Sequence, residues 1–277
     1  MGYSHSTVHD LPQLKGATSR ITSPGAEMKQ TPAIKPHHTM RGHTERVGGV
    51  AHLPDRRRTI TCSYDGSIRL WDMERGIQIG DEWQDDSNKT PVLSIALPPN
   101  GETVVSGSSN GIVRLWDAET RKVIARWKGH TSCVWSVCWS ADGERVMSGS
   151  WDANTGKLRS TIKHEDAVRS LAWISDQKKL ISGSWDGSIR IFDTATWQGI
   201  VVLKGHTDLV YSESLSLFQN DRLLASASSD KTVRLWNLDT NLPVSPPLLH
   251  QERVISATIS ADGKRLVTGC CDKNTYI

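Results

Sequence analysis

The sequence has few of the features that mark secreted, membrane-spanning or metal-bound proteins. No apolar run approaches the ~20 residues needed to cross a bilayer, and the N-terminus lacks the apolar core of a secretory signal. Cysteine occurs only five times, an odd number, and no two cysteines form a CxxC pair. This pattern argues against a disulfide framework or a zinc knuckle and suits a reducing compartment. We therefore expect an intracellular protein, cytoplasmic or nuclear, without a bound metal.

A strong excess of charge of either sign is also missing. The net charge of the 277 residues is +3, and the first 36 residues supply +2 of it from four basic and two acidic side chains. The rest of the chain lacks the positive field typical of nucleic-acid-binding domains, so we expect neither a nucleic-acid nor a membrane partner. Hydrophobic residues make up 37% of the chain and charged residues 23%, which is enough to bury the core of one large domain or two small ones.

Aromatic residues are used unevenly, because tryptophan occurs 11 times whereas phenylalanine occurs twice and tyrosine four times. A hydrophobic stretch ends in Trp-Asp or a close variant at Trp71-Asp72, Trp116-Asp117, Phe192-Asp193 and Trp236-Asn237. A histidine recurs at His43, His130, His164, His206 and His250. From each of these histidines except His206, an aspartate follows at an interval of 22 residues. Such fixed offsets indicate a repeated unit of about 42 to 45 residues.

Each unit reads as a series of short strands. Stretches such as Val134–Trp139 and Val168–Trp173 are rich in β-branched and aromatic residues, and turn dipeptides such as Asp142-Gly143 follow them. A second strand, a tight turn with Asp-Gly or Asn-Gly, a third strand and a more polar fourth strand complete the unit. Four antiparallel strands in succession, with the most apolar one innermost, make one blade of a β-propeller.

These motifs, over residues 34–277, resemble those of the WD40 repeat family. The resemblance implies an all-β, WD40-type propeller of about six blades. It also implies a hydrogen-bonded tetrad in each blade, formed by the histidine, a Ser or Thr of the second strand, the turn aspartate and the Trp of Trp-Asp. By position, two tetrads are complete: His43, Ser63, Asp65 and Trp71, and His206, Ser228, Asp230 and Trp236. Because the pattern recurs at fixed spacing, we interpret it as structural and not as an acid–base catalytic pair.

Three units depart from the pattern. The second lacks the histidine and has Asn110 at the turn, so we expect a looser blade. The fourth has Phe192 where the others have Trp, and it loses the indole N–H donor. In the third, Asp152 lies 12 residues before His164, where the matching interval is 20 in the fourth and fifth units. We expect this third blade to lack a strand.

The ends of the chain leave the closure of the ring open. The last unit stops before its Trp-Asp, so we expect a truncated last blade. Residues 34–41 stand at the offset of a fourth strand and are a candidate to complete that blade and close the ring. A small closed ring and a truncated relative of a larger ring both remain open. Residues 1–33 are rich in Ser, Thr, Gly and Pro without periodicity and are expected to form a disordered tail.

The sequence contains no GxSxG, HExxH or Walker-type phosphate-binding motif. We therefore expect no catalysis, no cofactor and no small-molecule substrate. In the family, partners usually dock on the face formed by the turns that precede the third and inner strands. Residues at those turns combine exposed aromatic rings with arginines, a combination typical of binding hot spots. The candidates are Arg46, Tyr64, Trp135, Trp151, Arg169, Trp185, Tyr211 and Arg253.

The leading hypothesis is thus a non-catalytic scaffold that binds a peptide or protein on one face. Near-identical repeats that exchange by recombination would also suit a ligand-recognition module derived from a larger multidomain sensor or regulator. An adjoining nucleotide-binding or effector domain would favour that alternative. A G-protein β-like subunit is a weaker alternative, because the chain lacks the N-terminal coiled-coil heptads that such a subunit needs.

Overall fold

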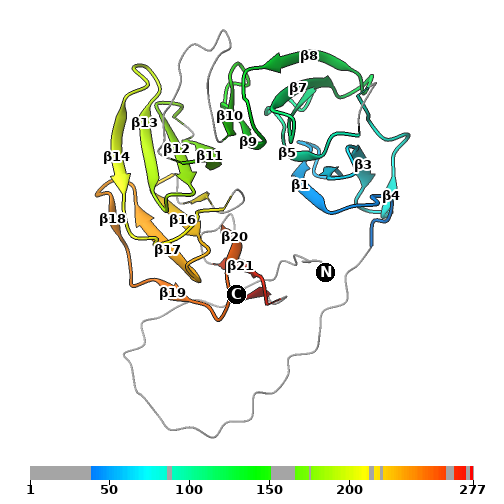
Figure 1. Ribbon diagram of the computed structural model, residues 1–277. Coiled ribbons are helices and arrows are strands. Elements are labelled where there is room, and N and C mark those ends of the chain that lie inside the picture. The colour runs from blue at the N-terminus through cyan, green and yellow to red at the C-terminus, as the bar shows by residue number, and fades with distance from the viewer. Residues whose placement is uncertain are drawn as a thin grey trace, which may run out of the picture.

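The computed structural model describes residues 39–85, 89–150, 166–174, 176–211, 215–218, 221–259, 265–272 and 275–276. Every regular element within these ranges is a β-strand, and the strands form six antiparallel sheets in chain order. The sheets follow one another around a common centre, as the change of colour from blue to red shows (Figure 1). The prediction of an all-β propeller with about six blades is confirmed. Since the described residues form no helix, none of them forms a helix that could span a bilayer.

The first two sheets each contain four strands that pair in sequence order. The first sheet consists of β1 (Val47–His52), β2 (Arg58–Ser63), β3 (Ile68–Asp72) and β4 (Ile77–Gln78). The second consists of β5 (Val92–Ala96), β6 (Thr103–Ser108), β7 (Ile112–Asp117) and β8 (Val123–Lys128). The second sheet keeps its full set of strands even though its unit lacks the histidine.

The third sheet differs from its neighbours. Within the described residues it contains two strands, β9 (Val134–Trp139) and β10 (Val146–Ser150). The predicted loss of a strand falls on residues 151–165, which lie outside the described ranges, and it stays a prediction. The fourth sheet again has four strands, β11 (Val168–Trp173), β12 (Lys179–Ser184), β13 (Ile189–Asp193) and β14 (Gly199–Leu203).

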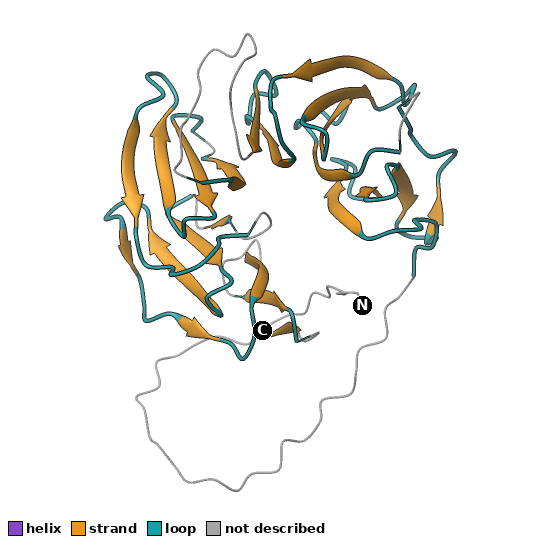
Figure 2. Ribbon diagram, in the orientation of Figure 1, coloured by secondary structure: helices purple, strands orange, loops and turns teal. Residues whose placement is uncertain are grey.

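The last two sheets complete the arc (Figure 2). The fifth contains β15 (Ser216–Phe218), β16 (Leu223–Ala227), β17 (Thr232–Asn237), β18 (Leu242–Pro243) and β19 (Leu248–Leu249), and β17 pairs with both β18 and β19. The sixth contains three described strands, β20 (Val254–Ile259), β21 (Leu266–Cys270) and β22 (Thr275–Tyr276).

The closing strand expected at 34–41 is not tested by the structure. Its described part, residues 39–41, belongs to no strand, and the remainder lies outside the described ranges. Residues 1–33 lie there as well. The tail and the closing strand both stay predictions.

The apolar core lies between successive sheets, where one face of a sheet packs against the next sheet along the chain. One cluster joins Ile60 and Leu70 of the first sheet to Val104 and Trp116 of the second. A second cluster joins the fourth and fifth sheets through residues such as Ile181 and Trp236. The tryptophans of the Trp-Asp pairs are therefore core residues, as their recurrence in the sequence indicates.

Glycine permits the closest approach between sheets. A Cβ on Gly48 of β1 would stand 2.7 Å from the carbonyl oxygen of Val92 on β5. At the turn before β7, Gly111 has a φ of 78°, and a Cβ there would stand 2.3 Å from the carbonyl oxygen of His130. At both positions the lack of a side chain lets one blade pack directly against the backbone of the next blade along the chain.

Candidate functional site

A buried hydrogen-bond network fixes the first blade. His43 Nδ1 lies 3.0 Å from Asp65 Oδ2, and His43 Nε2 lies 2.8 Å from Thr61 Oγ1. The indole N–H of Trp71 donates to the same Thr61 hydroxyl at 2.8 Å. The network thus links the loop before β1 to β2, its turn and β3, and it satisfies three ring nitrogens that burial would otherwise leave without partners.

The fifth blade repeats this arrangement with almost the same distances. His206 Nδ1 lies 2.9 Å from Asp230 Oδ2, and His206 Nε2 lies 2.8 Å from Ser226 Oγ. Trp236 Nε1–H donates to Ser226 Oγ at 2.9 Å. The two networks are therefore structural elements of the fold.

The hydroxyl member of each tetrad differs from the expectation. It is Thr61 and not Ser63 in the first blade, and Ser226 and not Ser228 in the fifth. Ser63 lies at the end of β2, where its hydroxyl donates to the carbonyl oxygen of Glu45 at 3.2 Å and accepts the amide of Asp65 at 3.1 Å. The serine next to the turn therefore caps the turn, and the residue two positions earlier is the one that the indole reaches diagonally across the sheet.

Ser228 has the same capping role in the fifth blade. Its hydroxyl donates to the carbonyl oxygen of Asp208 at 2.8 Å and accepts the amide of Asp230 at 3.1 Å. A sequence signal for the true tetrad hydroxyl was available. A Ser or Thr stands four residues before the turn position in all six units, whereas the position two residues before it holds Cys270 in the last unit.

The second blade replaces the missing histidine with an ion-pair network. Arg114 of β7 donates from Nε to Asp85 Oδ2 at 2.5 Å and from Nη1 to Ser108 Oγ at 2.7 Å. Asp85 also pairs with Arg126 of β8, and hydrogen bonds from Arg126 and Arg114 hold the pKa of the Asp85 carboxyl well below its ordinary value. The indole of Trp116 still donates to Ser106 Oγ at 2.8 Å. This blade keeps its four strands by a different set of polar contacts.

Acid should weaken the first blade through Asp65. Burial alone raises the pKa of this carboxyl, but hydrogen bonds from the Ser67 hydroxyl and amide, the Thr44 amide and His43 together lower it to about 2. A lowered carboxyl pKa stabilises the folded chain above the unfolded pKa of 3.8, and this stabilisation is lost as pH falls through about 2. Burial also lowers the pKa of His43, so protonation of the ring below its ordinary pKa acts in the same direction.

Asp65→Asn is therefore expected to cost about 2 kcal/mol at pH 7, with the difference from the unsubstituted chain falling to roughly half at pH 3 and vanishing below pH ~2. Urea unfolding followed by circular dichroism at pH 7, 5 and 3 measures it. A difference that stays constant over this range would show that the charge of Asp65 contributes nothing.

One backbone contact recurs at the same end of five sheets. The residue just before the turn position donates its amide to the carbonyl oxygen of the residue just before the inner strand, at distances of 2.9 to 3.0 Å. The donor and acceptor pairs are Tyr64 and Arg46, Ser109 and Pro91, Trp185 and Ala167, Ser229 and Leu209, and Cys271 and Arg253. The candidates Arg46, Tyr64, Trp185 and Arg253, which belong to the sheets with this contact, thus lie at the same end of their sheets.

On this face, the guanidinium of Arg169 lies over two indole rings. Its guanidinium carbon is 3.6 Å from the ring centroid of Trp135 on β9 and 4.9 Å from that of Trp185, which follows β12. Trp135 is the second residue of β9, the inner strand of the third sheet, and Arg169 is the second residue of β11, the inner strand of the fourth. Trp185 also belongs to the fourth sheet, so the two rings come from different blades. Cation–π stacking therefore joins the third and fourth blades at the surface.

Two further pairs flank this stack. Arg46 donates from Nη2 to the Tyr64 hydroxyl at 2.6 Å, and its guanidinium lies 4.4 Å from the centroid of the same ring. Tyr211 accepts a hydrogen bond from the Ser229 hydroxyl at 2.9 Å. We use the name partner face for the set Arg46, Tyr64, Trp135, Arg169, Trp185 and Tyr211.

The aromatic rings of the partner face are less exposed than expected. Trp135, Trp185 and Tyr211 are half-buried, because Arg169 and neighbouring blades cover part of each ring. Arg46 and Arg253 are exposed. The remaining candidate, Trp151, lies outside the described residues, so its place on this face stays a prediction.

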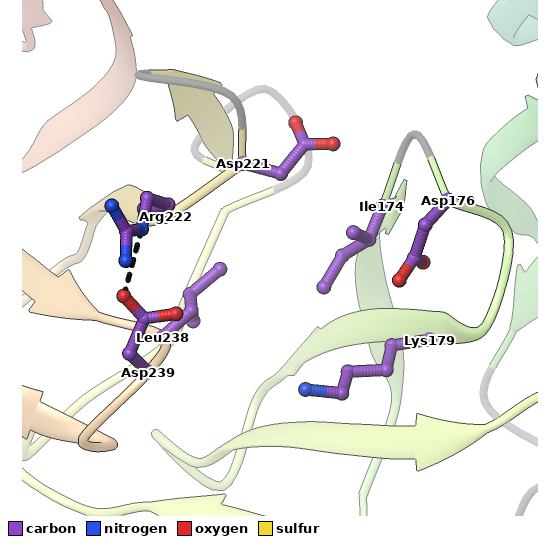
Figure 3. A pocket seen from close by; sticks show the side chains of 7 residues that line it. All are labelled: Ile174, Asp176, Lys179, Asp221, Arg222, Leu238 and Asp239. Carbon is purple, nitrogen blue, oxygen red and sulfur yellow. Dashed lines mark hydrogen bonds and ion pairs between the residues drawn. The ribbon is translucent and has the colours of Figure 1, made fainter.

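A cavity opens at the opposite end of the sheets. It has a volume of about 170 Å³ and lies between the fourth and fifth blades. Figure 3 shows Arg222 paired with Asp239 on one side, at 2.9 Å, with Asp176 and Lys179 on the other side. Its polar side chains come from turns, and the Arg222–Asp239 pair is largely exposed. This shallow site offers no pair of groups arranged for catalysis.

Metal chemistry has no support in the part of the chain that the structure describes, where no group of three or more His, Cys, Asp or Glu residues could hold an ion. The cysteines at positions 62, 133, 138, 270 and 271, all within the described ranges, form no disulfide with one another. Burial raises the pKa of the Cys138 thiol to about 12 and that of Cys270 to about 11, which keeps both thiols protonated and unreactive.

Comparison with known proteins agrees with this geometry. The family model described as "WD domain, G-beta repeat" matches residues 34–72, 84–117, 121–154, 156–193 and 197–237. Autophagy-related protein 16 of Arabidopsis thaliana is 29% identical over 243 residues, covering 87% of this chain and 40% of that protein. Striatin of Rattus norvegicus is 24% identical, covering 86% of this chain and 35% of that protein.

A shorter match is more similar in sequence. Guanine nucleotide-binding protein subunit beta of Zea mays is 34% identical over 130 residues, covering 44% of this chain. The chain spans well under half the length of each of these relatives. The five repeat matches extend over more than half of its residues, and the chain belongs to the WD40 repeat family.

Proposed function

We propose that the chain is a non-catalytic interaction scaffold that binds a peptide or protein segment on the partner face. The observation that carries this proposal is the stack of Arg169 between Trp135 and Trp185. Tryptophan, tyrosine and arginine are the side chains most enriched in binding hot spots, and here they gather from four blades onto one face. WD40 propellers are in general non-catalytic scaffolds, in agreement with this arrangement.

The partner face is also prepared for binding at low entropic cost. Each of its arginines is already held against an aromatic ring, and two of its tyrosines are hydrogen-bonded through their hydroxyls. Side chains that are ordered before a partner arrives lose little rotamer freedom when it binds. The partner is a protein or peptide, with no role for nucleic acid, membrane or small-molecule substrate, and the free cysteines suit a reducing cytoplasmic or nuclear location.

Trp185→Ala is expected to reduce capture of a protein partner from a cell extract at least about tenfold, as loss of a central hot-spot ring does, while lowering the melting temperature by only a few degrees. Trp127→Ala is the matched control, because Trp127 lies on the outer strand β8 and is 45% exposed. Mass spectrometry of the captured proteins and a thermal melt of each variant measure the two effects. Equal losses of capture in both variants would contradict a role for the partner face.

A second candidate is a G-protein β-like subunit. The similarity to guanine nucleotide-binding protein subunit beta supports it, but this similarity covers 44% of the chain. Mixing the chain with a guanine-nucleotide-binding α subunit and separating the mixture by gel filtration distinguishes the two functions. Co-elution would favour the G-protein function over a general scaffold.

A further inference from the structure

Among the residues that the structure describes, Arg169 has aromatic neighbours but no anionic one. Its guanidinium forms no hydrogen bond or ion pair with any described residue, and its contacts are the rings of Trp135 and Trp185. Two other arginines on the inner parts of the sheets do have carboxylate partners, Arg114 with Asp85 and Arg190 with Asp186. Arg169 thus carries a half-buried positive charge that the described part of the chain does not compensate.

The surroundings make this charge unfavourable. Burial lowers the pKa of Arg169, and the nearby positive charge of Arg46 lowers it further, whereas Tyr64 and Tyr211 act in the opposite direction. Arginine stays protonated in proteins, so these effects do not remove the charge and instead weaken the folded state. Arg46 also forms no ion pair with a described carboxylate, since its hydrogen-bond partner is the Tyr64 hydroxyl. An arriving anion would meet two uncompensated cations.

The geometry leaves one part of the guanidinium available. The guanidinium carbon lies over both indole rings, and Nε is shut off from solvent without an acceptor. The terminal nitrogens form no hydrogen bond with a described residue and do not share this burial. Their N–H donors are therefore open to solvent on the partner face, and a guanidinium can bind two oxygens of a carboxylate or phosphate through such donors.

The same stack disfavours a cationic ligand. Two facing indoles are a favourable site for a lysine or methylated lysine when the space between them is empty. Here the chain's own arginine occupies that space, and Arg46 adds a second positive charge nearby. We therefore propose that Arg169, held between Trp135 and Trp185, binds an anionic group, a carboxylate or a phosphate, on the partner peptide. This inference rests on the proposed scaffold function and names the chemistry of its partner.

The test uses the full chain and four libraries of twelve-residue peptides with random flanks. The libraries differ only at one central position, which is glutamate, phosphoserine, glutamine or lysine. We expect the glutamate library, the phosphoserine library or both to bind at least about tenfold more than the glutamine and lysine libraries, since charge-assisted bidentate contacts are the strong ones. Binding should also fall as salt rises.

Two substitutions assign this preference to one side chain. Arg169→Gln should remove the preference for the anionic libraries, and Arg169→Lys, which keeps the charge but loses the fork, should retain only part of it. Arg222→Gln is the matched control at the other end of the sheets, where Arg222 is already paired with Asp239, and it should change nothing. Thermal melts of all three variants show whether each remains folded.

The outcomes distinguish an acidic peptide from a phosphorylated one, and they distinguish failure of the anion site from failure of the scaffold function. Stronger binding of the glutamate library identifies an acidic peptide, and stronger binding of the phosphoserine library identifies a phosphorylated one. Equal binding of the glutamine or lysine library, or an unchanged preference in folded Arg169→Gln, would overturn the anion site. If the anion test fails but Trp185→Ala still loses a captured partner, the scaffold function holds and only the anion site is wrong. If Trp185→Ala captures the same partners as the unsubstituted chain, the scaffold function itself is wrong.

Discussion

Trp236→Ala is expected to lower the free energy of unfolding by about 3 to 5 kcal/mol, one of the two largest effects expected for a single substitution in this chain. Trp236 is only 2% exposed and packs in the cluster that joins the fourth and fifth blades. Removing its ring opens a cavity between two blades and leaves the Ser226 hydroxyl without its indole donor. Chemical unfolding followed by circular dichroism measures the loss.

Trp236→Phe separates the ring from its N–H. The fourth blade already holds Phe192 at this position, where it is 5% exposed, so a phenyl ring fits the site. We expect this variant to cost about 1 kcal/mol, the contribution of one hydrogen bond. If the phenylalanine and alanine variants were equally unstable, the indole hydrogen bond and not the packing would stabilise the blade.

Two serine variants test which hydroxyl belongs to the tetrad. Ser226→Ala removes the partner of both Trp236 and His206 and should cost more than Ser228→Ala, which removes only a turn cap. The reverse order would restore the assignment expected from the sequence.

Asp85→Ala is expected to cost about 3 to 5 kcal/mol, the second large effect. It removes the carboxylate that pairs with Arg114 and Arg126, and Arg114 is only 6% exposed. A buried guanidinium without an anion is far more costly than the loss of the pair as a whole. The same unfolding experiment measures this effect.

The control for Asp85 is an exposed pair. Asp239→Ala breaks the contact with Arg222, whose side chain is 68% exposed, and should cost less than ~1 kcal/mol. A second control combines Asp85→Ala with Arg114→Met, which removes both charges and should recover much of the loss. A double variant as unstable as Asp85→Ala alone would mean that packing around Asp85, and not the stranded charge, causes the effect.

The fold was largely predictable because its information is local and repeated. The turn dipeptides, the strand residues and, in four units, a buried Trp or Phe recur at fixed offsets, so the strands and their order follow from the chain itself. The same offsets predicted which end of each sheet carries the residues Arg46, Tyr64, Arg169 and Trp185, because the period of the repeat equals the period of the structure.

The sequence-based predictions were wrong or incomplete where a side chain has more than one possible partner in the folded structure. Ser63 and Thr61 lie on the same strand with the same kind of hydroxyl, and only the reach of the Trp71 indole across the sheet distinguishes them. The ion pair of Arg114 with Asp85 joins residues 29 positions apart, in a blade without the histidine network of the first and fifth blades. It occurs in one blade of the described structure, so no repeated offset in the sequence predicts it.

The sequence by itself therefore determined the number of units, the strand order within each and the face on which the candidate binding residues lie, because these depend on residues close together in the chain. Only the tertiary structure decided which atoms meet between strands and between blades. The stack of Arg169 between Trp135 and Trp185 brings together residues from two blades, and its uncompensated charge depends on which carboxylates lie within reach. Distances of this kind are set by how the sheets pack, and packing follows from the sum of many contacts across the molecule.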